Sequence, residues 1–200
     1  KGDWLDHLRG EKWSFRVKTE PEKAWKRLKT FSLQDPITRS YLKEWLLHKL
    51  FKKEDILTTR YDFITMTLND KTLGLYVYEE HFLKQIPEFN KKREGPIIKF
   101  TENGLWEARL QAHKIGLSMH HGDDKANPDI RPFSEGKTLK DPNLSNQFQI
   151  AQKLLYQYQF GLKKPKEIFN LDLLAKYYAI MDVSGAHHGV IWHNQRFYYN

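Results

Sequence analysis

Residues 12–20 alternate between apolar and polar side chains along most of their length. A period of two residues places successive side chains on opposite faces of a strand, so this pattern predicts a strand with one buried face. The other face carries three positive charges. The apolar side chains are Trp13, Phe15 and Val17, and the cations are Lys12, Arg16 and Lys18.

A β-hairpin is predicted for residues 61–80. The first half alternates, the Asn-Asp pair at 69–70 is a turn signal, and the second half returns as a strand. Two shorter strands are predicted further along the chain. One spans residues 95–100 after a Gly-Pro break, and the other is the aromatic run at residues 192–200.

Three longer segments carry apolar residues at helical spacing. The clearest early helix lies within residues 35–56, where apolar residues recur at i, i+3, i+4 and i+8. Two later helices are predicted at 143–161 and 170–188, with Gly161 as a stop for the first and Asn170 as the N-cap of the second. The stripe of the early helix consists of Leu42, Trp45, Leu46 and Leu50.

The order of these elements predicts an α+β fold, because strands dominate the first half and helices the second. Residues 116–142 contain several Gly and Pro breaks and predict a long loop. A seam between two lobes is expected near residues 80–100. The whole chain is interpreted as one domain, with a strand-rich lobe at 1–100, an insertion at 101–142 and a helical lobe at 143–200.

The composition is that of a globular protein, with 40% hydrophobic and 14% aromatic residues. No apolar run approaches 18 residues, so no membrane span is expected. The absence of cysteine excludes disulfides and thiolate metal sites. The net charge of +8 favours anionic partners, but the basic clusters are short and no stacking-and-basic motif occurs, so nucleic acid is not expected as a partner.

Five short motifs follow one another along most of the chain. Within them, Gly74, Tyr76 and Glu80 fit a GxYxxxE pattern, and Lys99 fits the lysine of a GxLYK strand. The motifs are KWSFRVK (12–18) with a Leu-rich helix led by Arg39, LNDKTLGLYVYEEHF (68–82), GPIIKF (95–100), FNLDLLAKYYAIMDV (169–183) and HNQRFYYN (193–200). In this order they resemble the spore-coat-protein-H-type (CotH) kinase family.

The resemblance implies an atypical protein-kinase-like fold with a strand-rich small lobe and a helical large lobe. It also implies that ATP and Mg²⁺ bind between the lobes and that phosphate is transferred to Ser or Thr of a protein substrate. Members of the family are found in bacteria, where many are exported or attached to the cell surface, so the same compartment is an expectation for this chain.

Phosphoryl transfer depends mainly on positioning and charge neutralisation, so it requires a cation on the phosphates. Lys12 aligns with the lysine of the first family strand and is the first candidate, with Arg16 and Lys18 on the same face as reserves. Lys99 is a candidate for a second phosphate contact. For each lysine, an ordinary solvated surface position is the alternative interpretation.

Two acidic residues are further candidates for the nucleotide site. Glu44 lies on the helix that follows the first strand, where a kinase uses a Glu to orient its phosphate-binding Lys. Glu80 lies at the exit of the hairpin, where it would hold the adenine edge or a backbone amide. A solvated helix position for Glu44 and a structural hydrogen bond for Glu80 are the alternatives.

Asn194 is the candidate metal ligand, because a kinase places a magnesium-binding Asn five residues after its catalytic Asp. Here the residue five positions earlier is Gly189. The base is therefore either Asp182, twelve residues before Asn194, or a nearby histidine, His187 or His188. A turn-capping role for Asn194 and the loss of the base are the alternatives.

From the ends of the sequence we expect a piece of a longer protein. The chain begins with Lys1 and runs at once into what resembles the first family motif. The second acidic metal ligand of the family is expected beyond Asn200. The fold is accordingly expected to be incomplete at both ends.

Two other functional classes remain open. One is a binding or surface module whose kinase-like site has lost its chemistry. The other is a His-based metal hydrolase that uses MHHGDD (119–124) and GAHHG (185–189), whose residue types are accepted by zinc. The hydrolase lacks a helical HExxH spacing and does not explain the hairpin motif.

Overall fold

The computed structural model describes residues 8, 10–82, 85–118 and 128–200. The chain divides into two compact units, Lys1–Lys91 and Lys92–Asn200. The boundary lies within the interval 80–100 where the sequence predicts a seam. Among the described residues, no helix is long and apolar enough to cross a membrane.

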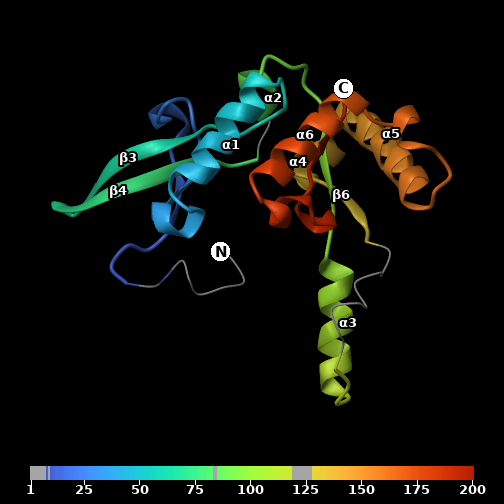
Figure 1. Ribbon diagram of the computed structural model, residues 1–200, viewed down its shortest axis with the longest axis horizontal. Coiled ribbons are helices and arrows are strands. Elements are labelled where there is room, and N and C mark those ends of the chain that lie inside the picture. The colour runs from blue at the N-terminus through green and yellow to red at the C-terminus, as the bar shows by residue number, and fades with distance from the viewer. Residues whose placement is uncertain (1–7, 9, 83–84, 119–127) are drawn as a thin grey trace. The chain divides into compact units, whose positions relative to one another are not determined.

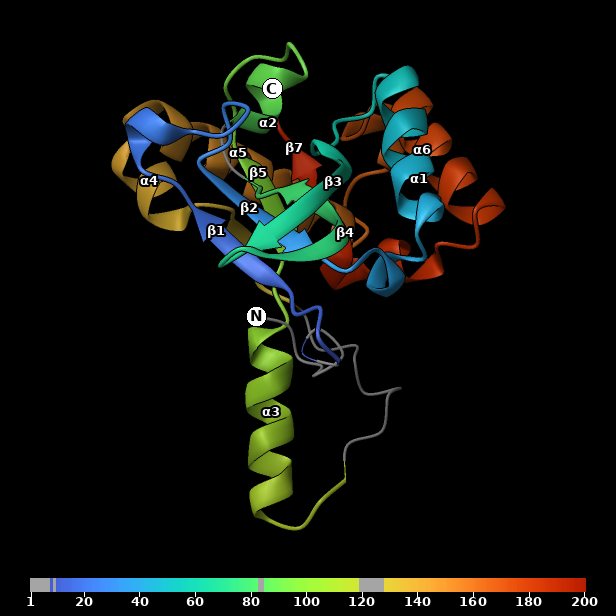
Figure 2. The same cartoon turned by 90° about the vertical axis from the view of Figure 1, so that its left-hand side faces the viewer.

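The first unit contains a four-stranded antiparallel sheet with the order β1-β2-β4-β3 (Figure 2). The predicted hairpin is confirmed, since β3 and β4 pair along their length. Its turn residues Asn69 and Asp70 both have positive φ, 48° and 60°, a conformation that Asn and Asp adopt more readily than most residues. The strands are β1 (Phe15–Lys18), β2 (Thr30–Gln34), β3 (Tyr61–Leu68) and β4 (Lys71–Glu80).

The core of the first unit lies on one face of this sheet. Strand β1 confirms the middle of the strand predicted at 12–20, and Phe15 and Val17 pack against the core as expected. Trp13 differs from the prediction, because it precedes β1 and is 52% exposed. The fully enclosed members of the core are Leu28, Phe31, Leu33, Tyr76 and Tyr78.

Helix α1 (Leu42–Lys53) confirms the early helix, but its predicted apolar stripe is only partly covered, since Trp45 and Leu50 are half-buried and its two other members are not. Leu42 and Leu46 are 65% and 52% exposed. The helix is instead held to β3 by a polar contact, in which Trp45 Nε1 donates to Asp62 Oδ1 at 3.0 Å. A stripe residue thus joins α1 to β3 through a hydrogen bond, whereas the two N-terminal leucines of the stripe face solvent.

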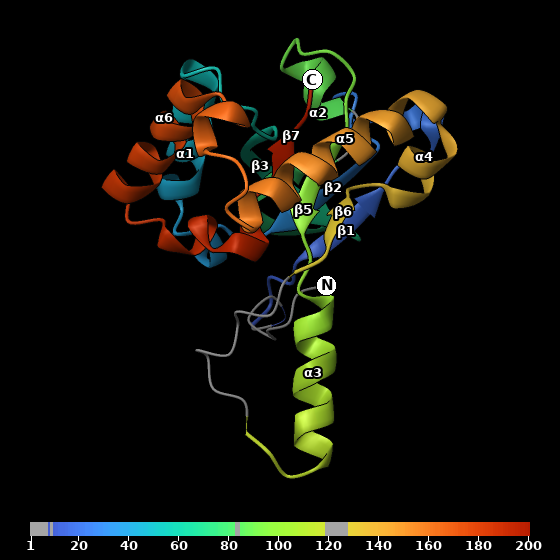
Figure 3. The ribbon, with the colours of Figure 1, turned by 90° about the vertical axis from the view of Figure 1, so that its right-hand side faces the viewer.

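The second unit is built on a three-stranded antiparallel sheet with the order β6-β5-β7. Helix α5 (Pro142–Gln159) covers one face of it and confirms the helix predicted at 143–161 (Figure 3). The strands are β5 (Ile97–Phe100), β6 (Ile130–Pro132) and β7 (Phe197–Tyr198). The buried cluster between sheet and helix is Ile98, Phe100, Ile130, Phe148, Ala151 and Leu155.

Helix α6 (Leu171–Val183) begins as predicted, because the Asn170 side chain accepts a hydrogen bond from the Leu173 amide at 3.2 Å. The strand predicted at 192–200 is mostly wrong. The 3₁₀ turn η7 (Trp192–Asn194), which follows η6 (His187–Val190), occupies the start of this region, and only the two residues of β7 pair with β5.

Four elements were not predicted. Helix α3 (Asn103–Lys114) projects from the sheet of the second unit (Figure 1). Leu105 is its one buried residue, and its other large apolar side chains, Trp106 and Leu110, are exposed. Strand β6 and helix α4 (Glu135–Lys140) lie in the segment predicted to be a loop, and α2 (Gln85–Phe89) was also missed. Short elements with few buried residues give little periodic signal.

Candidate functional site

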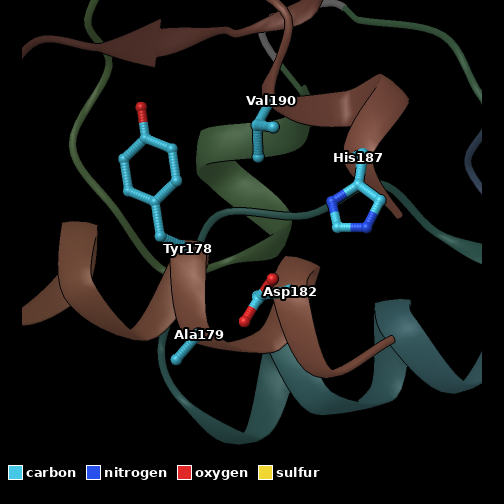
Figure 4. A pocket seen from close by; sticks show the side chains of 5 residues that line it. All are labelled: Tyr178, Ala179, Asp182, His187 and Val190. Atoms are coloured by element: carbon cyan, nitrogen blue, oxygen red, sulfur yellow. The ribbon is translucent and has the colours of Figure 1, made fainter. Parts of the chain in front are cut away.

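A pocket of about 380 Å³ lies between the end of α6 and the 3₁₀ turn that follows it (Figure 4). It brings together Asp182 and His187, two of the three residues considered for the catalytic base. Asp182 lies in the last turn of α6, and His187 opens η6. The remaining lining residues are Tyr178, Ala179 and Val190.

Asn194 is held beside this turn by its side-chain amide. Its Nδ2 donates to the His188 carbonyl at 2.9 Å, and its backbone amide donates to Ile191 O at 2.8 Å. These bonds correspond to the turn-capping alternative. They leave Oδ1 without a donor among the described residues, so the same side chain presents an amide oxygen of the kind that Mg²⁺ accepts.

Gly189 takes the position at which the kinase spacing would require the catalytic Asp. Its carbonyl accepts a hydrogen bond from the Tyr177 hydroxyl at 2.9 Å. A Cβ at this position would lie 2.0 Å from Met181 Cε, so the buried Met181 side chain would have to move to admit any larger residue. The Met181 methyl is the end of a flexible side chain and can shift, so the absence of an Asp here is a feature of the sequence, and the carboxylate candidate for a base is Asp182.

Lys99 lies in the centre of the sheet of the second unit. Strand β5 pairs with β7 through Ile97↔Tyr198 and Ile98↔Phe197, and one further step of this register places Lys99 opposite Arg196. Lys99 Nζ lies 5.3 Å and Arg196 Cζ 5.0 Å from the centroid of the same ring, Phe133. The two cationic groups are therefore at most about 10 Å apart.

These two cations have little compensation from acidic groups. Burial lowers the pKa of Lys99 and of Arg196, the charge of Arg196 lowers the pKa of Lys99 further, and Glu102 opposes both shifts. Arg196 Nε is buried and has no hydrogen-bond partner among the described residues. Arg196 Nη1 donates to the His193 and Gln195 carbonyls at 2.7 Å and 2.9 Å. Like charges at opposed strand positions are unfavourable, so a nearby anion would stabilise this face of the sheet.

Arg131 is the neighbour of Lys99 on the other side, in β6. It differs from Arg196 because Asp129 and Glu135 pair with it at 2.6 Å and 3.0 Å. The net positive charge of this sheet face is therefore concentrated on Lys99 and Arg196.

In the first unit, Lys12 and Arg16 have only weak or neutral partners among the described residues. Lys12 Nζ donates to the Leu75 carbonyl at 3.4 Å. Arg16 Nη2 lies 2.9 Å and 2.8 Å from the two ring nitrogens of His81. Burial, followed by the charges of Arg16 and Lys18, lowers the pKa of His81, so a neutral imidazole is favoured there.

Glu44 does not pair with Lys12 in this structure. Its carboxylate lies 3.6 Å from Arg39 Nε and 3.9 Å from His48 Nε2. The kinase-type Lys–Glu pair expected from the resemblance is therefore not formed between these two residues.

Glu80 is occupied by a buried ion pair. Arg60 donates to it through Nη2 at 2.6 Å, Nε at 3.0 Å and its backbone amide at 3.1 Å. The carboxylate is 3% exposed. Both oxygens are used within the first unit, and this geometry favours the structural alternative over contact with an adenine ring.

The predicted residues thus fall into two groups. Lys99, Asp182, His188 and Asn194 lie in the second unit, whereas Lys12, Arg16, Glu44 and Glu80 lie in the first. The sequence prediction did not include Arg196 or Arg60 among the site residues. The strand registers place Arg196 opposite Lys99 and Arg60 opposite Glu80, so correct strand pairing would have identified both. The motif at 119–124 lies outside the described residues.

Comparison with known proteins identifies the family. The family model described as CotH kinase protein matches residues 1–199. A comparison with curated proteins found no match. Because the family match covers almost the whole chain, the chain belongs to the CotH kinase family.

Proposed function

We propose that this chain is a kinase-like phosphotransferase that transfers the γ-phosphate of ATP to a Ser or Thr hydroxyl of a protein. The observation that carries the proposal is the family match over residues 1–199. The proposal includes the two-lobed kinase-like arrangement, with nucleotide and Mg²⁺ bound between the lobes.

The phosphate contacts are assigned to cations that lack tight carboxylate partners among the described residues. Lys99 is the first of these, because it is half-buried, faces a second cation and has its pKa lowered by burial. Lys12 and Arg16 are the corresponding contacts from the first unit. Glu44 and Glu80 pair with Arg39 and Arg60 respectively, so their proposed roles in the nucleotide site are indirect.

Asn194 and Asp182 carry the remaining roles in the proposal. Asn194 Oδ1 would bind Mg²⁺, which would neutralise charge on the phosphates. Asp182, with His188 as the other candidate, would accept the proton of the acceptor hydroxyl as its oxygen bonds to the γ-phosphorus and the bond to ADP breaks. The pocket at Asp182 supports this assignment.

Transfer of labelled γ-phosphate from Mg·ATP to casein and to the chain itself tests the proposal. We expect incorporation by the unmodified chain and a loss of about 10²-fold in Lys99→Met and Asn194→Ala, the scale for removing one group that stabilises transition-state charge. Lys166→Met and Asn143→Ala are matched controls on exposed positions of the same unit and should retain activity.

A non-catalytic binding module is the second candidate. The sequence has Gly189 where the kinase spacing requires an Asp, and this departure favours the module. Saturable Mg·ATP binding without transfer would support the module, and an absence of both would overturn the nucleotide-based proposal.

A further inference from the structure

Three side chains of the first unit converge at the inner face of α1. Glu44 and His48 are one turn apart on α1, and Glu79 faces them from β4. One ligand atom from each lies within 4.8 Å of the others. We propose that Glu44, His48 and Glu79 bind one divalent transition-metal ion, with Zn²⁺ as the reference ion.

The imidazole of His48 is already oriented for this role. Its Nδ1 lies 2.7 Å from Thr58 Oγ1, and the ring stacks on Tyr61 with centroids 4.8 Å apart. These contacts fix the ring and leave Nε2 directed toward Glu44 Oε1 at 3.9 Å. A hydrogen bond on one ring nitrogen with the other nitrogen free for a metal is the usual arrangement of a metal-binding histidine.

The two carboxylates each use one oxygen in an outer contact. Glu44 Oε2 faces Arg39 Nε at 3.6 Å. Glu79 Oε2 accepts from Gln34 Nε2 at 3.0 Å and lies 4.0 Å from Arg39 Nη2. The described contacts leave the Oε1 atom of Glu79 without a donor.

Arg39 neutralises these carboxylates only in part. Its ion pairs with Glu44 and Glu79 are longer than the roughly 2.7–2.9 Å of a tight charge-assisted hydrogen bond. Its Nε donates instead to Gln34 Oε1 at 3.0 Å. Two carboxylates therefore share one guanidinium through long contacts, and a cation between them would add to this compensation.

Tyr61 supplies an independent observation. It is 4% exposed, and its hydroxyl is buried without a hydrogen-bond partner among the described residues. Its ring stacks on that of His48, which places this side chain next to the cluster. Unpartnered buried hydroxyls are uncommon, and a metal ion or a metal-bound water would give this one a partner.

The donor set determines the class of ion. One imidazole nitrogen with carboxylate oxygens suits Zn²⁺, whereas Mg²⁺ prefers oxygen ligands in an octahedral arrangement. Bonds of about 2.0–2.2 Å place the ligands of a tetrahedral ion roughly 3–3.5 Å apart. The ligand atoms here lie within 4.8 Å of one another, so the side chains would approach by at most about 1–2 Å on binding. This site lies wholly in the first unit and does not depend on the proposed phosphotransfer.

Isothermal titration of the chelator-treated chain with Zn²⁺ tests the proposal. We expect one site per chain whose affinity falls at least tenfold in both His48→Gln and Glu79→Gln. The matched controls His113→Gln and Glu11→Gln remove the same side-chain types at positions away from the cluster and should bind as the unmodified chain does. Circular dichroism identifies any variant that fails to fold.

A second, milder variant keeps the test decisive if either ligand substitution disrupts folding. Thr58→Val removes only the hydrogen bond that orients His48, and we expect it to weaken Zn²⁺ binding about tenfold, as outer contacts of metal ligands commonly do. The proposal is overturned if no one-to-one site is found. It is also overturned if Zn²⁺ binds equally well to Glu79→Gln, since the ion would then lie at other histidines.

Discussion

The buried pair Arg60–Glu80 yields the sharpest stability prediction, through the substitution Arg60→Met. The change keeps an apolar stem of similar length but removes the guanidinium from Glu80. The two side chains are only 14% and 2% exposed, so water does not replace the lost partner. The substitution Arg60→Met also removes the hydrogen bond from Arg60 Nη1 to Lys26 O at 2.8 Å and the contact of the guanidinium with the Phe89 ring.

The expected magnitude follows from the cost of leaving one buried charge unpaired, about 3–5 kcal/mol. In the unmodified chain the backbone amide of residue 60 donates to Glu80 Oε2. The double variant Arg60→Met/Glu80→Gln removes both charges, and the amide oxygen of the introduced Gln remains as an acceptor for that backbone amide. It should therefore recover most of that loss. With the single variant Glu80→Gln the cycle is complete, and its coupling energy measures the interaction between the two side chains.

Hydrogen exchange followed by mass spectrometry is the suitable assay, because it reports on β3 and β4 separately from the second unit. A loss of about 3–5 kcal/mol corresponds to exchange accelerated by about 10²-fold or more in these strands. Acceleration below tenfold in Arg60→Met would refute the reasoning. So would a double variant that is no more stable than the single one.

Three further predictions concern other parts of the chain. Phe148→Ala should destabilise the second unit by about 3–5 kcal/mol in urea unfolding, because Phe148 lies in the buried cluster under α5; a loss below ~1 kcal/mol would contradict this packing. Asn170→Ala should cost about 1 kcal/mol through loss of the α6 cap, whereas Asn170→Asp should be nearly neutral in the same measurement. NMR titration should place the pKa of His81 below its ordinary value, and Arg16→Gln should move it upward. Between the lowered pKa of His81 in the folded state and its ordinary pKa in the unfolded state, the unfolded chain binds more protons, so His81 makes folding less favourable as the pH falls through this range. A His81 pKa that does not change in Arg16→Gln would contradict the assigned role of the Arg16 charge.

Elements with strong local signals were predictable from the sequence. The Asn-Asp turn located the hairpin, and Asn170 located the start of α6. The hairpin register also contains the Arg60–Glu80 pair, because Tyr61 lies opposite Glu79 and the next step places Arg60 opposite Glu80. That pair was therefore accessible to sequence reasoning, although we did not predict it.

The features that escaped prediction depend on contacts between distant segments. Lys99 and Arg196 are almost a hundred positions apart, and only the β5–β7 register places them together. The polar face of α1 likewise becomes meaningful only when Glu79 of β4 lies against it. Hydrophobic periodicity favoured a leucine face for this helix. It gave no information on the polar face, because the spacing of apolar residues does not show which polar groups have partners.

The most direct test of the account is calorimetric titration of the chain with Mg·ATP. We predict saturable one-to-one binding that weakens at least tenfold in Lys99→Met and in Arg196→Met and is unchanged in Lys166→Met. An absence of saturable binding at millimolar Mg·ATP, or equal affinity in all three variants, would contradict a phosphate site in the second unit.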